Sequence, residues 1–129
     1  MPSVRNLFGR RRGGGGSGPD FSHVDSQDKA EQLASRGELA RLHLVPPEFG
    51  GTDDPGNLVY VPSFVVELKQ ETDANVIAPL VREGRVRSYA ATPRYEGTSF
   101  VPVSIEIRAS DPGDFETSLR IWGPALADG

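Results

Sequence analysis

The 129-residue chain contains no cysteine and no long apolar run, and each absence excludes a class of protein. Without cysteine, neither a disulfide framework nor a thiolate metal site is possible. No apolar stretch approaches the roughly 20 residues that a membrane-spanning helix requires, so no membrane span is predicted. The N-terminal arginines are not followed by an apolar segment, which argues against a secretory signal peptide. We therefore expect a cytoplasmic protein or one exported by a route that needs no signal peptide.

Charge is unevenly distributed along the chain. Lys and Arg total 14 against 18 Asp and Glu, which gives a net charge of −4. Residues 1–18 hold four arginines and no acid, so the remainder has ten bases against eighteen acids. An acidic body opposes strong non-specific attraction to phosphate backbones, because that attraction comes from basic side chains releasing counterions. The same charge suits a basic protein partner.

The length allows one domain with tails. Residues 1–20 are predicted to be a disordered, basic, glycine-rich tail, because Gly13–Gly16 and the residues after it have the composition of a flexible linker. An alternative is that Val4, Leu7 and Phe8 form an apolar patch with the arginines, for a membrane or nucleic-acid surface. Residues 21–123 are predicted to be the folded domain and residues 124–129 a C-terminal tail.

The first half of the domain is predicted to contain a helix and a hairpin. Asp25 or Ser26 caps a helix that reaches about Arg36, and Gly37 ends it. Apolar and basic residues alternate over residues 39–45, which predicts a strand with Arg41 and His43 on one face. A double glycine at positions 50 and 51 and an Asp-Asp-Pro-Gly run mark two turns before a second strand over residues 58–61.

A helix is predicted from Ser63 to Gly84. Its inward positions follow helical spacing: Val65, Leu68, Thr72, Val76 and Leu80. Its outward positions are polar: Glu67, Lys69, Gln70, Glu71 and Asp73. Pro79 lacks a backbone donor and predicts a kink or break near Ala78.

The last third is predicted to be an antiparallel β-meander with strands over residues 85–92, 100–109 and 115–122. The second strand alternates with a period of two, with its apolar side formed by Val101, Val103, Ile105, Ile107 and Ala109. The helix from Ser63 is expected to cover that side. The predicted fold class is α+β.

Several short motifs recur in a familiar order over residues 41–122. They are Arg41 with His43-Leu44-Val45, Gly50-Gly51, Asn57-Leu58-Val59, Glu83-Gly84 and Pro93–Ser99. In order and spacing the chain resembles the DNA/RNA non-specific endonuclease family, the ββα-metal or His-Me finger nucleases, and most of all the small toxin domains of bacterial secreted proteins. The resemblance implies a ββα-metal-like hairpin and helix packed on the meander, and metal-dependent hydrolysis of phosphodiesters.

The resemblance also implies roles for three residues. His43 matches the general base that draws a proton from the attacking water, a role that suits an imidazole. Arg41 matches the arginine that offsets charge developing on the phosphate. Asn57 matches an asparagine that helps to position the site. The implied cofactor is Mg²⁺ or Mn²⁺ and the implied partner is nucleic acid.

The chain departs from the family at the metal site. The family motif D-R-G-H reads Ala40-Arg41-Leu42-His43, and the metal-binding asparagine expected nine residues after Asn57 is Val66. Valine offers no oxygen to a hard cation. Glu67 is a candidate ligand if the register shifts by one residue; alternatively it belongs to a solvated acidic face. Three functions stay open: an active endonuclease, a catalytically inactive binding module, and an immunity-type protein that binds a toxin.

Overall fold

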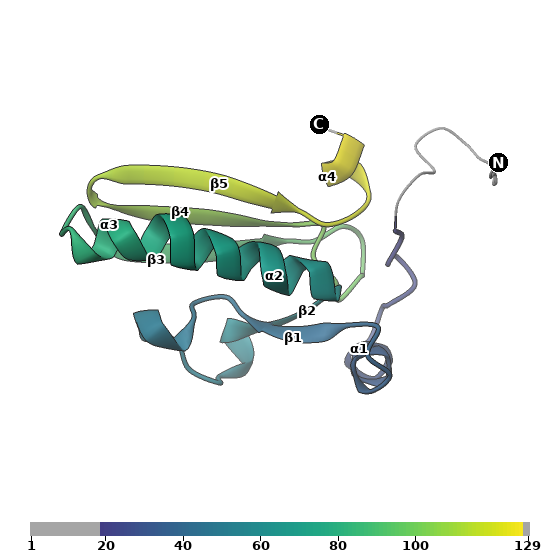
Figure 1. The fold of residues 1–129 in the computed structure, drawn as a ribbon. Helices are drawn as coiled ribbons and strands as arrows, with labels where there is room; N and C mark the ends of the chain where they lie inside the picture. The colour runs from purple at the N-terminus through teal and green to yellow at the C-terminus, as the bar shows by residue number, and fades with distance from the viewer. Residues whose placement is uncertain (1–18, 128–129) are drawn as a thin grey trace.

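The computed structural model describes residues 19–127, so the predicted N-terminal tail lies outside it except for Pro19 and Asp20. Two antiparallel sheets and a few helices make up the fold (Figure 1). A two-stranded hairpin and the helix α1 lie on one side of a long helix, and a three-stranded sheet lies on the other. The α+β class is confirmed at this level. None of the helices in the described residues is long and apolar enough to cross a membrane.

The helix α1 runs from Gln27–Ser35, and its ends follow the predicted signals. The Ser26 side chain accepts a hydrogen bond from the backbone N–H of Lys29 at 3.2 Å, which satisfies one of the free donors of the first turn. Gly37, just past the end, has φ +81°, a conformation that glycine adopts at little cost. The helix is thus capped at both ends as the sequence predicts.

The hairpin consists of β1 (Ala40–His43) and β2 (Leu58–Val61). Arg41 pairs with Tyr60 and His43 with Leu58. The first strand is shorter than predicted, because the chain turns at the two prolines into a 3-10 turn over Pro47–Phe49. A second 3-10 turn over Pro55–Asn57 leads into β2.

The long helix consists of α2 (Ser63–Thr72), a π-helical turn over Asp73–Ile77 and α3 (Ala78–Arg82). The three segments follow one another without interruption (Figure 1). A π-helical turn widens the backbone hydrogen-bond pattern. The predicted kink or break near Ala78 corresponds to this change in helix type directly before the segment that contains Pro79; the chain itself stays helical.

The prediction of which face of this helix is buried was right at Val65 but wrong at Leu68, Val76, Lys69 and Asp73. The buried positions recur every four residues and are Val65, Lys69, Asp73 and Ile77. Leu68 and Val76, which were expected inside, are 41% and 38% exposed. Lys69 and Asp73 are buried together as an ion pair, so each offsets the charge of the other.

The second sheet has the order β3-β4-β5, with β3 (Val86–Arg94), β4 (Ser104–Pro112) and β5 (Asp114–Arg120), all antiparallel. Both ends of β4 lie further along the chain than predicted, but the alternation holds, since Ile105, Ile107 and Ala109 are buried. α2 packs against β5 and α3 against β3. A short helix, α4 (Pro124–Ala127), stands where a C-terminal tail was predicted.

One hydrophobic core joins both sheets. It contains Val59 and Val61 of the hairpin, Val65 of α2, and Ile107 and Leu119 of the larger sheet. Trp122, the single tryptophan, is buried at the end of β5, where its indole N–H donates to the carbonyl oxygen of Val101 at 2.9 Å. The hairpin is therefore held in place by the same apolar contacts that hold the sheet.

Candidate functional site

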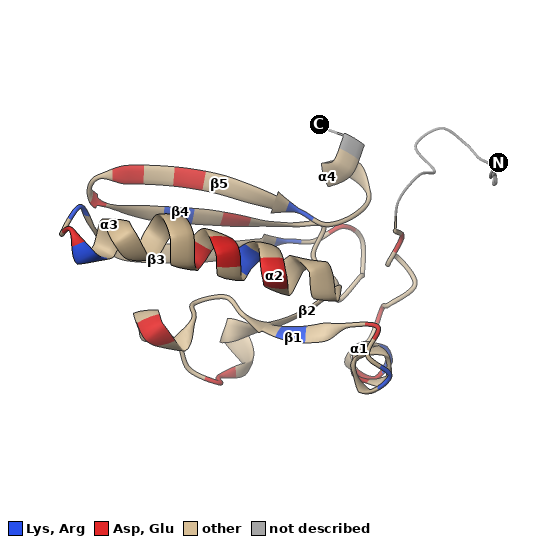
Figure 2. Ribbon diagram, viewed as in Figure 1, with Lys and Arg blue, Asp and Glu red and all other residues tan. Residues whose placement is uncertain are grey.

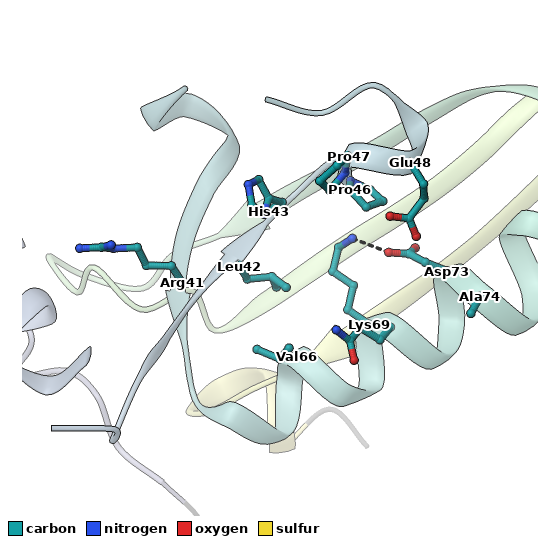
Figure 3. A pocket seen from close by; sticks show the side chains of 11 residues that line it. Arg41, Leu42, His43, Pro46, Pro47, Glu48, Val66, Lys69, Asp73 and Ala74 are labelled. Carbon is teal, nitrogen blue, oxygen red and sulfur yellow. Dashed lines mark hydrogen bonds and ion pairs between the residues drawn. The ribbon is translucent and has the colours of Figure 1, made fainter. Parts of the chain in front are cut away.

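Arg41 and His43 lie on the same face of β1, as the alternation predicts. Leu42, between them, is buried and points toward α2, whereas the other two side chains extend away from that helix (Figure 3). Their cross-strand partners, Tyr60 and Leu58, share the outer face because directly paired residues of an antiparallel hairpin point to the same side. The outer face of the hairpin thus brings together an imidazole, a guanidinium and a phenol.

His43 is paired with Asp53, a residue that sequence reasoning missed. The Nε2 atom of His43 lies 2.7 Å from Oδ1 of Asp53. The carboxylate is 92% exposed and the imidazole side chain 33%. A carboxylate on one ring nitrogen fixes the orientation of the ring and leaves Nδ1 for another partner, which is the arrangement of an oriented general base. The only sequence signal for Asp53 is its place in the turn that returns the chain toward β1.

Asn57 holds the loop that carries Asp53. Its Nδ2 donates to the carbonyl oxygens of Val45 and Thr52 at 3.0 and 2.8 Å. Its Oδ1 accepts from the N–H of Val45 at 2.8 Å. Both amide protons are therefore used by the backbone. The structure brings Asn57 to the site as a residue that positions the loop rather than one that faces the His43–Asp53 pair.

The double glycine is required by the same loop. A Cβ atom on Gly51 would lie 1.6 Å from the carbonyl oxygen of Val45, so no other residue fits without moving the backbone. Gly50 has φ +95°, which side chains rarely adopt, although the space around it is open. Gly51 thus allows the loop to pack closely against the end of β1, where Asn57 fastens it.

Arg41 belongs to a polar network on the outer face. Its guanidinium carbon lies 6.0 Å from the ring centroid of Tyr60, and the Tyr60 hydroxyl donates to Glu31 of α1 at 3.2 Å. The hydrogen bond from Gln27, the one from Tyr60 and the charge of Arg41 together lower the pKa of Glu31. Residues of the hairpin and α1, with Tyr95 and Phe100, line a groove of about 420 Å³ here.

A cleft of about 440 Å³ lies between β1 and α2, and Arg41 and His43 line it together with buried ionisable groups of the long helix. Lys69, 2% exposed, donates to Oδ2 of Asp73 at 2.7 Å and to the hydroxyl of Tyr89 at 2.9 Å. That hydroxyl donates to Oδ1 of Asp73 at 2.8 Å, which closes a ring of three contacts. Figure 3 shows the Lys69–Asp73 pair beneath the loop that carries Glu48.

Burial changes the proton affinities of this triad. Burial lowers the pKa of Lys69, although the hydrogen bond and charge of Asp73 act in the opposite direction. Burial, followed by the hydrogen bond to Asp73, raises the pKa of Tyr89 far above its usual value. The phenol therefore stays protonated and keeps donating to the carboxylate throughout the ordinary pH range.

The residues of this cleft do not fit the Mg²⁺ or Mn²⁺ that the nuclease resemblance implies. Val66 lines the cleft, packs against the core and has no oxygen to offer. Both carboxylate oxygens of Asp73 are taken, and the ammonium group of Lys69 beside them repels a divalent cation. Glu67 is exposed and is not among the residues that line the cleft. Within residues 19–127, no group of three or more His, Cys, Asp and Glu side chains is arranged to hold a metal ion.

Comparisons with protein-family models, with curated proteins and with solved structures found no match to this chain. The resemblance to the nucleases therefore stays a prediction from the ordered sequence motifs.

Proposed function

We propose that this chain is a nuclease-like domain that has lost metal-dependent catalysis and binds a basic protein partner. The observation that carries the proposal is the cleft between β1 and α2. Where the nuclease resemblance calls for a metal ligand, this cleft has Val66, and beside it the closed triad of Lys69, Asp73 and Tyr89. An ammonium group and an apolar side chain are the opposite of what a divalent cation needs.

Charge supports a basic partner. Residues 19–127 contain ten Lys and Arg against seventeen Asp and Glu. Acidic positions occur in the loop between the hairpin strands, on α2 and on β5 (Figure 2). A surface of this sign attracts a positively charged protein and repels a polynucleotide. An immunity-type role is the form of this proposal in which the partner is a toxin.

Two experiments test the proposal. Plasmid DNA and a single-stranded RNA, incubated with excess protein and Mg²⁺ or Mn²⁺, should stay intact. In a native pull-down with mass spectrometry, the protein should retain a stoichiometric partner with an excess of Lys and Arg. That partner should be lost when Glu67 and Glu71 are both changed to Lys, and kept when Arg87 is changed to Lys, which preserves the charge. Recovery of no stoichiometric partner, or equal recovery with the charge-reversed protein, would refute the binding role.

A second candidate, an active endonuclease, is favoured by the 2.7 Å contact between His43 and Asp53 with Arg41 on the same face. In this function His43 takes a proton from the nucleophile, Asp53 orients the ring, and Arg41 offsets the charge of the phosphate. Metal-supported cleavage that disappears in His43→Ala and falls in Asp53→Asn would establish it. Cleavage of equal rate in wild type and His43→Ala would come from a contaminant and would end this candidate.

A further inference from the structure

The outer face of α2 carries an exposed apolar row. Phe64 and Leu68 of α2 are 44% and 41% exposed, and Val76, in the π-helical turn that continues α2, is 38% exposed. The buried stripe that faces the sheet lies on another side of the helix. None of the elements in residues 19–127 covers this row enough to bury it. Three large apolar side chains aligned on one helix face are a typical docking surface for an amphipathic segment.

Acidic side chains border the row. Glu67 and Glu71 are exposed and alternate with Phe64 and Leu68 around the same part of the helix. The lysine of α2, Lys69, is buried in its pair with Asp73 and contributes nothing to the outer face. We call the surface formed by Phe64, Glu67, Leu68, Glu71 and Val76 the α2 outer face. It is both apolar and negatively charged.

Residues 4–12 of the same chain have the complementary composition. They include the apolar residues Val4, Leu7 and Phe8, and the basic residues Arg5, Arg10, Arg11 and Arg12, without any acid. Four arginines and three bulky apolar residues thus stand within nine positions, with no acidic side chain among them. The charge of this segment is positive, whereas that of the α2 outer face is negative. Its apolar side chains can pack against the apolar row of that face.

We propose that residues 4–12 bind the α2 outer face of their own chain. The seven peptide units between Arg12 and Pro19 span at most about 23–25 Å when extended. The first described residues lie at the end of the molecule where α2 begins (Figure 1). Phe21 packs edge-on against Trp122 at a centroid distance of 6.2 Å, directly after β5, the strand against which α2 packs. A short glycine-rich connection raises the effective concentration of the segment to the millimolar range, so a weak contact suffices.

This contact does not depend on the proposed function, because it concerns the isolated chain. It has a consequence for any basic partner, however, since such a partner must displace residues 4–12 to reach Glu67 and Glu71. The segment then acts as a built-in competitor. Salt weakens the contact, because exposed charges are screened at high ionic strength.

The absence of cysteine makes the proposal directly testable by disulfide trapping in the full-length protein. We would introduce Phe8→Cys together with Leu68→Cys, and compare it with Phe8→Cys together with Ser118→Cys on the exposed side of β5. Under mild oxidation the first pair should give a cross-linked monomer in several-fold higher yield than the second, with a yield that falls at high salt. Equal yields from the two pairs would overturn the proposal. Disulfide-linked dimers in place of the monomer would overturn it as well, since the occupant would then be a second copy.

A charge exchange supplies the second test. In the Phe8→Cys/Leu68→Cys background, changing Arg10, Arg11 and Arg12 to Glu should lower the cross-link yield. Adding Glu67→Lys and Glu71→Lys should restore it. Adding Asp114→Lys and Glu116→Lys, which reverse two acids on β5, should not. If both pairs of lysines restore the yield equally, net charge alone is responsible and the specific contact is refuted. Circular dichroism verifies that each of these surface variants is folded.

Discussion

At the scale of single residues, Lys69 determines what the cleft between β1 and α2 can do. Its ammonium group is buried, and it is tolerated because Asp73 and Tyr89 supply an opposite charge and a hydrogen-bond acceptor. A buried ion pair often contributes little to stability compared with apolar residues of the same volume, but removing one member leaves the other charge unpaired. We therefore expect the three side chains to be strongly coupled.

This coupling predicts non-additive effects on stability. Lys69→Met and Asp73→Leu should each lower the free energy of unfolding by about 3–5 kcal/mol, because each leaves a buried charge without its partner. The double variant should be far more stable than the sum of the two losses implies. Urea denaturation followed by circular dichroism measures all three. Additive losses would mean that the two side chains act independently and that the pair does not have the energetic role assigned to it.

Tyr89 should make the stability of the folded protein decrease at high pH. Its pKa is raised in the folded protein, so the unfolded chain loses the phenolic proton first, near the ordinary value of 10.0. The contribution of Tyr89 to stability is therefore complete below about pH 10 and is lost as the pH rises above it. We expect the difference in unfolding free energy between wild type and Tyr89→Phe to shrink between pH 9 and pH 11. The other titrating groups are common to both proteins, so a constant difference would contradict the raised pKa.

Three glycines in one loop should respond differently to alanine. Gly51→Ala should prevent the loop from closing, because the new Cβ meets the backbone carbonyl of Val45. Gly50→Ala should cost about 1 kcal/mol for its positive φ. Gly56→Ala meets nothing and should be neutral or stabilise by about 0.4–1 kcal/mol. Thermal unfolding ranks the three variants, and a Gly51→Ala protein as stable as wild type would show that the loop packs elsewhere.

At the scale of elements, the loop between β1 and β2 is organised by Asn57 rather than by its own backbone. The amide of Asn57 bonds Val45 and Thr52, which lie at the two ends of the 3-10 turn and glycine segment. That fastening brings Asp53 to His43 across ten residues of sequence. The geometry of the candidate site therefore depends on a residue whose side-chain hydrogen bonds go to Val45 and Thr52 and not to His43 or Asp53.

Two substitutions of Asn57 distinguish the role of its N–H donors from that of its acceptor oxygen. Asn57→Ala should destabilise the protein by about 1–3 kcal/mol, because two backbone carbonyls and one N–H lose their partner. Asn57→Asp keeps the acceptor for Val45 but directs a carboxylate oxygen at two carbonyls, so it should be at least as harmful as alanine. Amide hydrogen exchange at Val45 should accelerate in Asn57→Ala and much less in Asn57→Asp. Equal protection in all three proteins would remove Asn57 from its positioning role.

The elements also explain how much the sequence could predict. α1 and the alternation of β4 were predictable because caps and a period of two are local signals, as Ser26 and Ile107 illustrate. The shared face of Arg41 and His43 followed from the same local rule. The buried face of α2 was not predictable, because Lys69 and Asp73 are charged residues that usually face solvent. Their burial depends on a tertiary contact with Tyr89 of β3, which the local sequence does not reveal. Asp53 was missed for a similar reason, since only closure of the loop brings it to His43.

At the scale of the whole molecule, the hairpin and the larger sheet form one folding unit. A two-stranded ribbon is marginal in water without a layer to pack on. Here Val59 and Val61 of the hairpin share a core with Ile105 and Ile107 of the sheet, and the long helix lies between the two layers (Figure 1). Neither layer can bury its apolar face when the other is lost. The outer face of the hairpin, with Arg41 and His43, is therefore only as stable as the core behind it.

This shared core predicts a single cooperative transition. Trp122 is the only tryptophan and reports on the end of the sheet, whereas far-ultraviolet circular dichroism reports on all helices and strands. Ile105→Ala in the sheet should lower the free energy of unfolding by about 2–5 kcal/mol, and Val61→Ala in the hairpin by somewhat less. Within each variant, tryptophan fluorescence and circular dichroism should give the same urea midpoint, lower than that of wild type. Val81→Ala, at a position that is 43% exposed, should stay within about 0.5 kcal/mol of wild type. If Val61→Ala instead lowers the dichroism midpoint and leaves the tryptophan midpoint in place, the hairpin unfolds separately, and substitutions in the sheet should then leave the His43–Asp53 site unaffected.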